Sequence, residues 1–493
     1  MIRREFLRGS AALAVVTSLS RPRFSLAASS VDIPAVSRTG AAITLRAAEL
    51  DAFRARQRGA VLTRASDGYD AVRRVWNGAF DRHPAVIARC TSTADVVGAV
   101  NFAAAQDLLV AVRGGGHSLP GYSVCEGGIM IDLAPMQGVR VDPQTLTARA
   151  EPGVLLAALD RETQAYGLVV PAGTVSHTGV AGLTLGGGVG RLQRKFGLTI
   201  DSMTGAEMVT ADGKVVRADA HENPELLWAL QGGGGNFGVV TSFEFRAHAF
   251  GRSAVAGDIV FPIEQARSVL GAFAEYCAKA SDDLWMDPVL ECDEAGHRQL
   301  NFNVCHCGDD AGAAKDIAAI RRFGKAVRDS VARKPWLVVQ SEHDAESPHG
   351  RGYYMSGGRV TGLVPALLDH AVESIKLPGA ELGKISLTQH GGASARRAAD
   401  STAYASRDAS HNFVVRAGWD DPKFAAARTA WQKQTWAKFA PFSSGLYANL
   451  NAAEIEVKAR SAYGDNLDRL VDVKTKYDPK NLFHLNPNIV PRA

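Results

Sequence analysis

The spacing of apolar residues predicts a series of helices and strands in the N-terminal half of the chain. Ser92 or Thr93 can cap a helix that runs to about Gln106, because apolar residues recur there at helical spacing. Residues 209–216 have the pattern of a hairpin about an Asp-Gly turn. Short apolar runs at 108–112, 129–133 and 145–150 predict buried strands, and a helix is expected after them at 155–166.

The pattern changes at about residue 250. Alternating segments at 257–261 and 299–305 predict strands, and alanine-rich segments at 266–278 and 312–328 predict helices. Such a mixture is typical of an antiparallel sheet backed by helices, so a second domain is expected here. The last forty residues have the pattern of one helix and a polar tail. The expected fold class is therefore α+β.

Glycine changes this picture, because 49 of the 493 residues are glycine, about 10% against a typical 7%. One cluster, Arg113 to Ser118, has three glycines followed by His117 and comes directly after an apolar strand. Backbone without Cβ atoms can pass close to a bulky anion and turn N–H groups toward it. A neutral imidazole is also a nucleophile near pH 7. The loop is either a turn with a satisfied histidine or a phosphate cradle that also bonds a cofactor.

A second glycine-rich stretch covers residues 171–190. Its glycines are expected to preclude a regular packed helix and to favour close backbone contact with something flat or charged. A flexible linker is the alternative. Val180, Leu183 and Leu185 are interleaved with the glycines, and linkers lack such apolar residues, so we reject that alternative.

A third cluster, Gly233 to Gly238, formally matches G-x-G-x-x-G. A short helix opened by Asn223 as cap and Pro224 at its first position precedes it, and a strand at 239–245 follows. A dinucleotide fingerprint needs the order strand, turn, helix, so a nicotinamide-binding Rossmann enzyme is disfavoured. None of the three clusters continues into Gly-Lys-Ser/Thr, which excludes a P-loop.

The N-terminus has the pattern of an export signal over residues 1–28, with Arg3 and Arg4 before an apolar run at 11–19 and then small residues. It resembles a twin-arginine signal, the alternative being a tail with two chance arginines. Its removal takes away five arginines and one glutamate, which lowers the net charge from +4 to about zero. Nucleic acid is therefore not an expected partner. The apolar run is too short for a stable anchor, so we expect a periplasmic or secreted protein without one.

Cysteine usage leaves two questions. Cys305-His306-Cys307 suggests a metal site, but no second ligand pair stands at a zinc-like spacing, and the alternation at 301–307 fits a strand. We therefore predict no metal. Disulfides among the six cysteines stay open, because connectivity does not follow from sequence.

Taken together, the ordered motifs at 113–118, 173–190, 223–238 and 477–483 resemble the berberine-bridge-enzyme-like flavoproteins of the vanillyl-alcohol-oxidase superfamily. The resemblance covers roughly residues 65–490. It implies a PCMH-type FAD-binding domain of two α+β subdomains. Residues 60–250 and a returning segment, 455–493, would form that domain, and 251–454 a substrate domain.

The resemblance and the glycine loops both imply FAD, whose pyrophosphate needs backbone donors and whose flat ring needs close backbone approach. In the family the histidine matching His117 is bonded to the flavin 8α-methyl carbon. Val175 stands where many members have a second, cysteinyl link, so a single attachment is predicted. The expected cofactor-binding residues are Arg113, Gly114, Gly115, Gly116, His117, Ser118, Gly121, Gly173, Thr174, Gly179, Val180, Gly182, Gly186, Gly187, Gly188, Gly190, Asn236, Gly238, Val239 and Asn486.

The resemblance does not identify the catalytic base. Family members often have Tyr-x-Asn-Tyr where this chain has Tyr447 to Leu450, so the second tyrosine is replaced by leucine. The candidates for the base are Tyr447, His390, Tyr404 and Tyr354, each of which could instead be an ordinary core residue.

The resemblance implies an oxidase that transfers hydride from a hydroxyl-bearing small molecule, such as a sugar or secondary metabolite, to FAD and then to O2. Val180 falls where the family has a small or branched aliphatic residue lining the flavin, which is compatible with oxygen access. The alternatives are a dehydrogenase with another acceptor and a flavin-carrying binding protein without turnover. The sequence leaves the substrate and the oligomeric state open.

Overall fold

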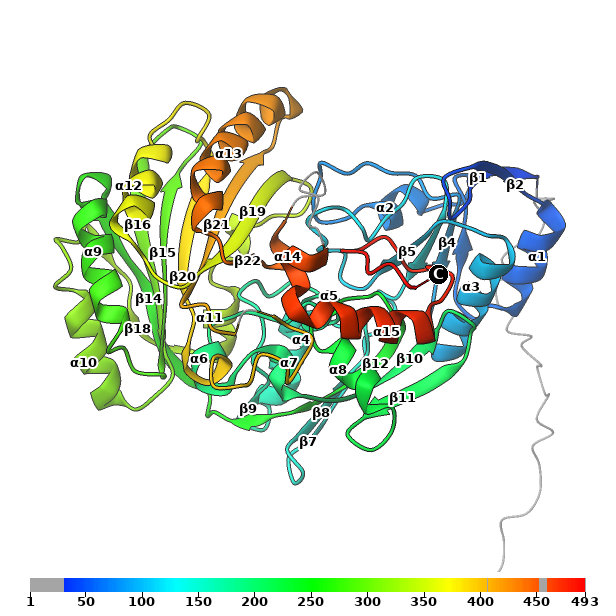
Figure 1. Ribbon diagram of the computed structural model, residues 1–493, viewed down its shortest axis with the longest axis horizontal. Helices are drawn as coiled ribbons and strands as arrows, with labels where there is room; N and C mark the ends of the chain where they lie inside the picture. Colours follow the sequence, from blue (N-terminus) through cyan, green and yellow to red (C-terminus); the bar gives the residue numbers. More distant parts are fainter. Residues whose placement is uncertain (1–30, 406, 452–458, 493) are drawn as a thin grey trace, which may run out of the picture.

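The computed structural model describes residues 31–405, 407–451 and 459–492 (Figure 1). The expected export signal lies outside the described residues. A four-stranded and a five-stranded sheet, called the two small sheets below, occupy one side of the molecule, and one large sheet occupies the other; two two-stranded sheets complete the set in the described residues. The structure has the mixed α+β class expected from the sequence.

The first small sheet has the order β3-β4-β6-β5 and is parallel except at its β3 edge. The helix α3 (Thr93–Ala105) begins where the sequence predicts, because the Ser92 side chain accepts a hydrogen bond from Asp95 N. Residues 31–59, for which the sequence predicts no element, add a hairpin and a helix whose apolar side chains join the core of this sheet. The bounds are β1 (Ile33–Val36), β2 (Ala42–Leu45), α1 (Ala47–Arg56), β3 (Val61–Leu62), α2 (Tyr69–Arg73), β4 (Val86–Arg89), β5 (Val110–Arg113) and β6 (Ile129–Asp132).

The second small sheet is antiparallel, in the order β11-β10-β12-β8-β7. Asn223 precedes α8 as predicted, but its side chain does not cap the helix. Asn223 has a φ of 50° and donates its amide to Arg217 O instead. The bounds are β7 (Val139–Asp142), β8 (Thr147–Ala150), α4 (Leu156–Gln164), β9 (Leu168–Val169), β10 (Met203–Thr210), β11 (Val215–Asp219), α8 (Pro224–Leu230), β12 (Gly238–Arg246) and β13 (His248–Ala249).

The glycine-rich stretch 171–190 contains a short helix, α5 (Val180–Leu185), so the expectation that glycine precludes one is wrong. Val180 and Leu185 are buried in the core of the second sheet, and this burial offsets the helix-weakening effect of Gly182. Two further short helices follow, α6 (Gln193–Phe196) and α7 (Thr199–Ser202).

The large sheet is antiparallel and, in the described chain, has nine strands, with β15 and β20 at its centre. Its strands all fall between residues 253 and 446, within the range expected for the substrate domain. The domain boundaries themselves stay predictions. The bounds are β14 (Ser253–Pro262), β15 (Leu284–Cys292), β16 (Arg298–His306), β17 (Arg328–Asp329), β18 (Ala332–Pro335), β19 (Gly352–Val360), β20 (Lys384–Gln389), β21 (His411–Trp419) and β22 (Gly445–Leu446).

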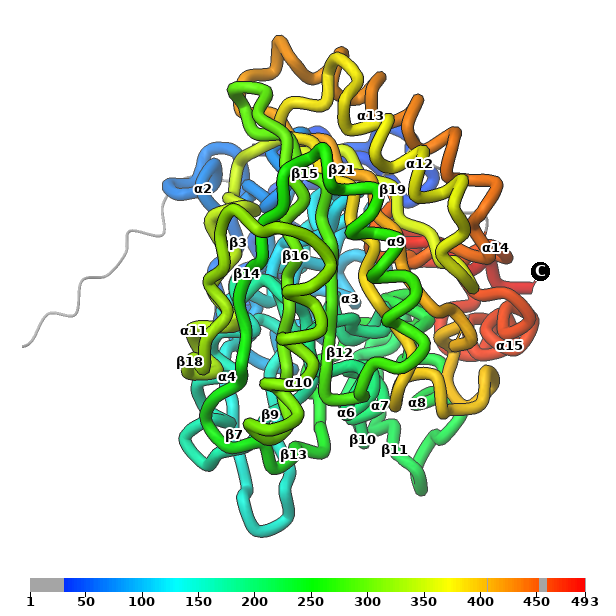
Figure 2. Tube along the Cα trace, turned by 90° about the vertical axis from the view of Figure 1, so that its left-hand side faces the viewer, coloured from blue at the N-terminus to red at the C-terminus, as the bar shows by residue number. Residues whose placement is uncertain are grey.

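Four helices cover the outer face of this sheet: α9 (Ala266–Cys277), α10 (Asp310–Ile320), α12 (Pro365–Ser374) and α13 (Ala425–Phe439) (Figures 1 and 2). The expected helix at 312–328 is shorter than predicted, because the chain leaves α10 after Ile320 and reaches the edge strand β17. Another short helix, α11 (Trp336–Ser341), packs against α4.

The C-terminal segment returns to the two small sheets (Figure 1) and has two helices rather than one, α14 (Ala459–Tyr463) and α15 (Leu467–Tyr477). Lys474 fixes it in place. Its ammonium group is fully buried and donates to Asn236 O, Phe483 O and the Asp478 carboxylate at 2.7–2.9 Å. A buried, fully bonded ion pair of this kind holds the segment in one register.

The fold bears on two points raised by the composition, disulfide bonds and membrane-spanning helices. All six cysteines are free. Within the described part of the chain, no helix is long and apolar enough to cross a membrane.

Candidate active site

A cavity of about 540 Å³ lies between the two halves of the molecule. One of its walls, called the glycine wall below, is formed by residues 114–118 and by cavity-lining residues of 173–190. The opposite wall, called the sheet wall, is formed by the cavity-facing side chains of β15, β16, β20 and β21. The cavity has the size of a cofactor or substrate site.

The sheet wall is polar because side chains alternate along each strand. On β20, Ile385 and Leu387 are buried against the outer helices, whereas Lys384, Ser386 and Thr388 line the cavity. The neighbouring strands repeat this alternation. Cavity-facing polar residues on them are Asp287, Asn303, Asn412 and Arg416.

The glycine wall depends on two loops that touch through their backbones. A Cβ on Gly115 would lie 2.4 Å from Gly179 Cα, so neither residue can carry a side chain without a shift of the loops. Gly116 has a φ of 72°, which glycine adopts without strain. The N–H groups of residues 115–118 donate no hydrogen bond to any described residue, which leaves a row of free donors.

The cavity brings together twelve of the twenty predicted cofactor-binding residues. They are Gly114, Gly115, Gly116, His117, Ser118, Gly173, Thr174, Gly182, Gly190, Gly238, Val239 and Asn486. The other eight, Arg113, Gly121, Gly179, Val180, Gly186, Gly187, Gly188 and Asn236, do not line it.

Most of these eight support the wall from behind. Gly187 leaves room for the Tyr404 ring, and Gly188 for Thr199. Val180 is fully buried in the core. The Asn236 amide donates to Gly233 O, and its Oδ1 accepts from Ile489 N of the C-terminal segment. Small size and backbone bonding explain why these residues resemble the site residues in sequence without reaching the cavity.

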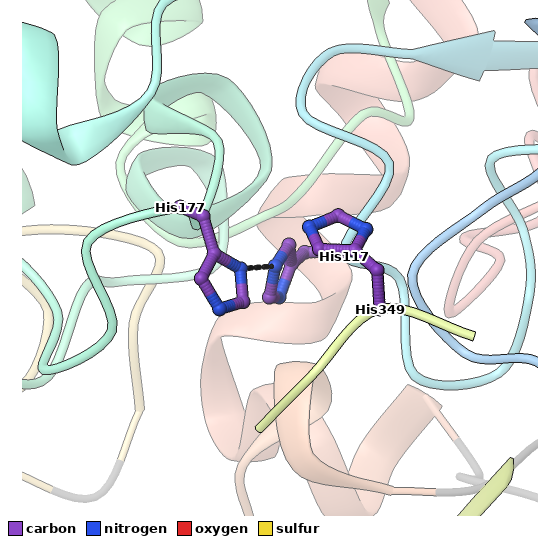
Figure 3. Close-up of side chains that lie close together, drawn as sticks. All are labelled: His117, His177 and His349. Carbon is purple, nitrogen blue, oxygen red and sulfur yellow. Dashed lines mark hydrogen bonds between the residues drawn. The ribbon is translucent and has the colours of Figure 1, made fainter. Parts of the chain in front are cut away.

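His117 lies at the end of the glycine loop, within a group of three histidines (Figure 3). Its Nε2 atom is 2.7 Å from His177 Nδ1, and the ring of His349 meets it edge-on. On the other side, the His117 ring stacks on Trp76 with centroids 4.7 Å apart. His117 Nδ1 forms no hydrogen bond to a described residue, so one ring nitrogen is held and the other is free.

The electrostatics keep His117 neutral. Burial, together with the neighbouring His177 and His349, lowers the pKa of His117 to about 3. A neutral imidazole with one free nitrogen is a nucleophile or a metal ligand. The ring nitrogens of the three histidines lie within 4.8 Å of one another, a spacing that could also hold a metal ion.

Tyr447 is the single predicted catalytic residue that lines the cavity. Its hydroxyl accepts hydrogen bonds from Gly188 N and from the Asn449 amide. Burial raises the pKa of Tyr447 to about 12, so its phenolate is scarce at neutral pH. The residue joins the sheet side of the cavity to the glycine wall.

The other three candidates lie outside the lining of the cavity. His390 is buried behind it, where burial and Arg359 lower its pKa to about 3. Tyr404 packs between Gly187 and the Arg359 guanidinium. Tyr354 lies against Lys433 of α13, on the helix side of the sheet. All three belong to segments adjoining the site, but alternation and packing direct them away from it.

Sequence reasoning missed the sheet wall. Asp287, Asn303 and Asn412 line the cavity, as do Glu346 and Arg416. The signal was the alternation Lys-Ile-Ser-Leu-Thr-Gln at 384–389, in which small polar residues take the positions facing away from the core. Which polar residues meet across strands follows only from the register.

The Cys305-His306-Cys307 segment is a strand, as predicted, and its side chains are used locally. His306 Nε2 lies 3.5 Å from an Asp316 oxygen, and Cys307 Sγ contacts Asp283 O. Among the described residues, the His, Cys and acidic side chains with metal-compatible spacing are those of His117, His177 and His349.

Two protein-family descriptions match the chain, an FAD binding domain at residues 84–219 and a berberine and berberine-like domain at 446–490. The (R)-6-hydroxynicotine oxidase of Paenarthrobacter nicotinovorans is 30% identical over 454 residues, which cover 88% of this chain and 97% of the relative. The chain belongs to the berberine-like FAD-linked oxidoreductases. It is an oxidoreductase with FAD as its cofactor, as the sequence predicts.

Other members extend this comparison. The chitooligosaccharide oxidase of Gibberella zeae is 27% identical over 83% of this chain and 88% of its own. A crystal structure of 6-hydroxy-D-nicotine oxidase from Arthrobacter nicotinovorans superposes with a TM-score of 0.77 at 29% identity, covering 88% of this chain and 98% of that one. The Acremonium strictum glucooligosaccharide oxidase shares the fold, with a TM-score of 0.82 at 23% identity and coverage of 90% and 99%.

The residues of this chain fit FAD. The free N–H groups of residues 115–118 suit a phosphate or a ring oxygen, and a Cβ on Gly115 would close the space between the loops. At the C-terminal end of the cavity, Asn486 Oδ1 is buried without a hydrogen-bond partner, as expected for an atom that meets a bound ligand.

Proposed function

We propose that this oxidoreductase is an oxidase that holds FAD covalently through His117. It takes a hydride from a hydroxyl-bearing small organic substrate and passes the electrons to O2, giving H2O2. When bound, FAD supplies the two-electron acceptor. The observation that carries the proposal is the environment of His117, a neutral imidazole with one free nitrogen beside free backbone donors, in the cavity that also contains the sheet wall.

A single attachment is supported by the residues around His117. Val175 lines the cavity and has no thiol. Cys125 cannot replace it, because its thiol contacts Leu109 O and Ile129 O behind the strands and burial raises its pKa to about 12. His117 Nδ1 is the nitrogen available for the bond, since Nε2 is held by His177.

The substrate class is supported by the sheet wall. Ser386, Thr388, Asn303 and Asn412 offer hydrogen-bond donors and acceptors to a hydroxylated molecule. The relatives named above include oxidases of 6-hydroxynicotine and of chitooligosaccharides. We therefore propose a sugar or a hydroxylated secondary metabolite.

Denaturation tests the covalent bond. The yellow colour should stay with the polypeptide, and a peptide map should locate one flavin on His117. His117→Ala should still fold, as measured before denaturation, and should release all of its flavin once it is denatured. Flavin that leaves the wild-type protein on denaturation contradicts the attachment.

The reaction is tested with (R)-6-hydroxynicotine, with chitooligosaccharides and with xylobiose, the sugar bound in a solved structure of a xylooligosaccharide oxidase from Myceliophthora thermophila that shares the fold. Reduction of the bound flavin without oxygen, followed by H2O2 formation in air, is the expected result. Reduction without peroxide formation would identify a dehydrogenase with another acceptor. A flavin that none of these compounds reduces would favour a binding protein.

Export by the twin-arginine route is proposed from Arg3 and Arg4 alone, in a segment outside the described residues. A double substitution, Arg3→Lys with Arg4→Lys, should retain the protein in the cytoplasm. Cell fractionation that finds both forms outside the cytoplasm would remove the proposal.

A further inference from the structure

We propose that Asp287 accepts the hydroxyl proton of the substrate, a role that rests on the oxidase activity proposed above. Asp287 lies near the middle of β15, where alternation directs Trp285, Asp287 and Val289 into the cavity. Its register partner on β16 is Asn303, which also faces the cavity. The carboxylate is therefore a central group of the sheet wall.

The two oxygens of Asp287 have different surroundings. Oδ1 accepts hydrogen bonds from Ser386 Oγ at 2.5 Å and from Thr388 Oγ1 at 2.9 Å, both on β20. Oδ2 accepts no hydrogen bond from a described residue and is not sealed from solvent. Two hydroxyls thus fix the carboxylate and leave one oxygen open toward the cavity, as a proton acceptor requires.

The other acidic residue that lines the cavity, Glu346, already has a hydrogen-bond partner on each carboxylate oxygen. Glu346 accepts from His343 Nδ1 at 2.8 Å through one oxygen and pairs with the Lys384 ammonium through the other. These partners hold the pKa of Glu346 far below its usual range. Of the two carboxylates that line the cavity, Asp287 is therefore the one with an oxygen that accepts no hydrogen bond from a described residue.

Tyr447 is a weaker candidate for the proton acceptor, because burial raises its pKa to about 12 and its oxygen already accepts two hydrogen bonds. His117 is assigned to the cofactor. Asp287 thus takes the role of proton acceptor that Leu450 cannot perform; Leu450 stands where many family members have a tyrosine.

Burial raises the pKa of Asp287, and the hydroxyls of Ser386 and Thr388 oppose this shift only in part. The charged groups that act on it from the other packed elements are Arg191, before α6, and His343, after α11, and both lower the pKa. A raised pKa makes the carboxylate a stronger base near neutral pH. The active form is deprotonated, so the rate should rise as pH increases through this pKa and fall below it.

In this role Asp287 Oδ2 would accept the proton of the substrate O–H bond as that bond breaks. The C–H bond would break with loss of a hydride, for which FAD supplies the acceptor when it is bound, and the alcohol would become a carbonyl. O2 would take up the two electrons and the proton carried by that hydride, together with one proton from the solvent, to give H2O2. Asp287 returns its proton to the solvent.

The test compares Asp287→Asn with Asp293→Asn in the complete, flavin-loaded protein. Asp293 is a suitable control, because it follows the same strand in an exposed turn and its carboxylate accepts hydrogen bonds from His297, four residues away, and not from the cavity. The measurement is the rate of anaerobic flavin reduction across pH, with chitooligosaccharides or xylobiose, because these sugars carry the alcohol C–H and O–H bonds that the step breaks. Flavin content and absorption spectrum report folding.

We expect Asp287→Asn to keep its flavin, to slow reduction about 100-fold or more, and to lose the acidic limb of the pH profile. Asp287→Glu should recover part of the rate, and Asp293→Asn should match the wild type. A flavin-loaded Asp287→Asn protein with the wild-type rate and pH profile overturns the inference alone. Loss of flavin from both Asp287 variants also overturns it, because the residue would then be structural. A wild-type flavin that no compound reduces overturns the proposed oxidase activity as well.

Discussion

The glycine wall presents backbone to the cavity, whereas the sheet wall presents side chains. In the glycine wall, Gly115 and Gly179 exclude side chains so that two loops can meet. In the sheet wall, Asp287 and Ser386 meet across two strands whose residues are about a hundred positions apart in the chain. The first wall therefore suits a cofactor common to a family, and the second can vary with the substrate.

The strongest disruption of the glycine wall is Gly115→Val. Its Cβ would lie 2.4 Å from Gly179 Cα, so the loops must separate, which should cost about 3 kcal/mol or more of stability and empty the flavin site. Flavin absorbance per chain measures the loss. Gly362→Ala is the control, because nothing lies within 4 Å of its added Cβ. Full flavin content in Gly115→Val would show that the close contact is dispensable.

Lys474→Met tests how far the glycine side depends on the C-terminal segment. The substitution leaves the buried Asp478 carboxylate without its cation, which should lower the free energy of unfolding by about 3–5 kcal/mol. Denaturant unfolding followed by tryptophan fluorescence measures this change. The exposed Lys476→Met should shift stability by less than about 0.5 kcal/mol. Equal stability of the two variants would contradict a structural role for the Lys474 pair.

His177→Ala tests whether the hydrogen bond to His177 is needed to orient the His117 ring. Removal of the 2.7 Å contact frees the His117 ring to turn, so the covalently bound fraction of flavin should fall about tenfold or more at a fixed time after loading. Flavin fluorescence on a denaturing gel reports that fraction. His349→Ala, which removes a ring contact and an electrostatic neighbour of His117 but no hydrogen bond, should keep most of it. An unchanged fraction in His177→Ala would mean that packing on Trp76 suffices.

The smallest effect is expected in the sheet wall, from Ser386→Ala. One of two donors to Asp287 is lost, so the reduction rate should fall about five- to tenfold. The lost donor stabilised the carboxylate, so the pKa of Asp287 rises further and the acidic limb moves to higher pH. Ser401→Ala, at an exposed site, is the control. A shift of the limb to lower pH would contradict the assigned hydrogen bond.

Much of the fold could be predicted from local pattern. The helix capped by Ser92, the strand before Gly114 and the alternation at 299–305 all lie where the sequence places them. The errors occur where tertiary contacts outweigh local preference. Burial of Val180 and Leu185 stabilises α5 despite its glycine, and the Asn223 side chain finds Arg217 O and Tyr477 Oη rather than its own helix.

The sequence by itself determined the cofactor, because the glycine runs act through backbone that is contiguous in the chain. Only the tertiary structure decided which of the polar side chains line the cavity. His390 and Tyr404 point away from the cavity, and Asp287 points into it, because the sense of alternation and the register of the large sheet set the direction of each side chain. A register is a relation between distant strands, and no local pattern contains it.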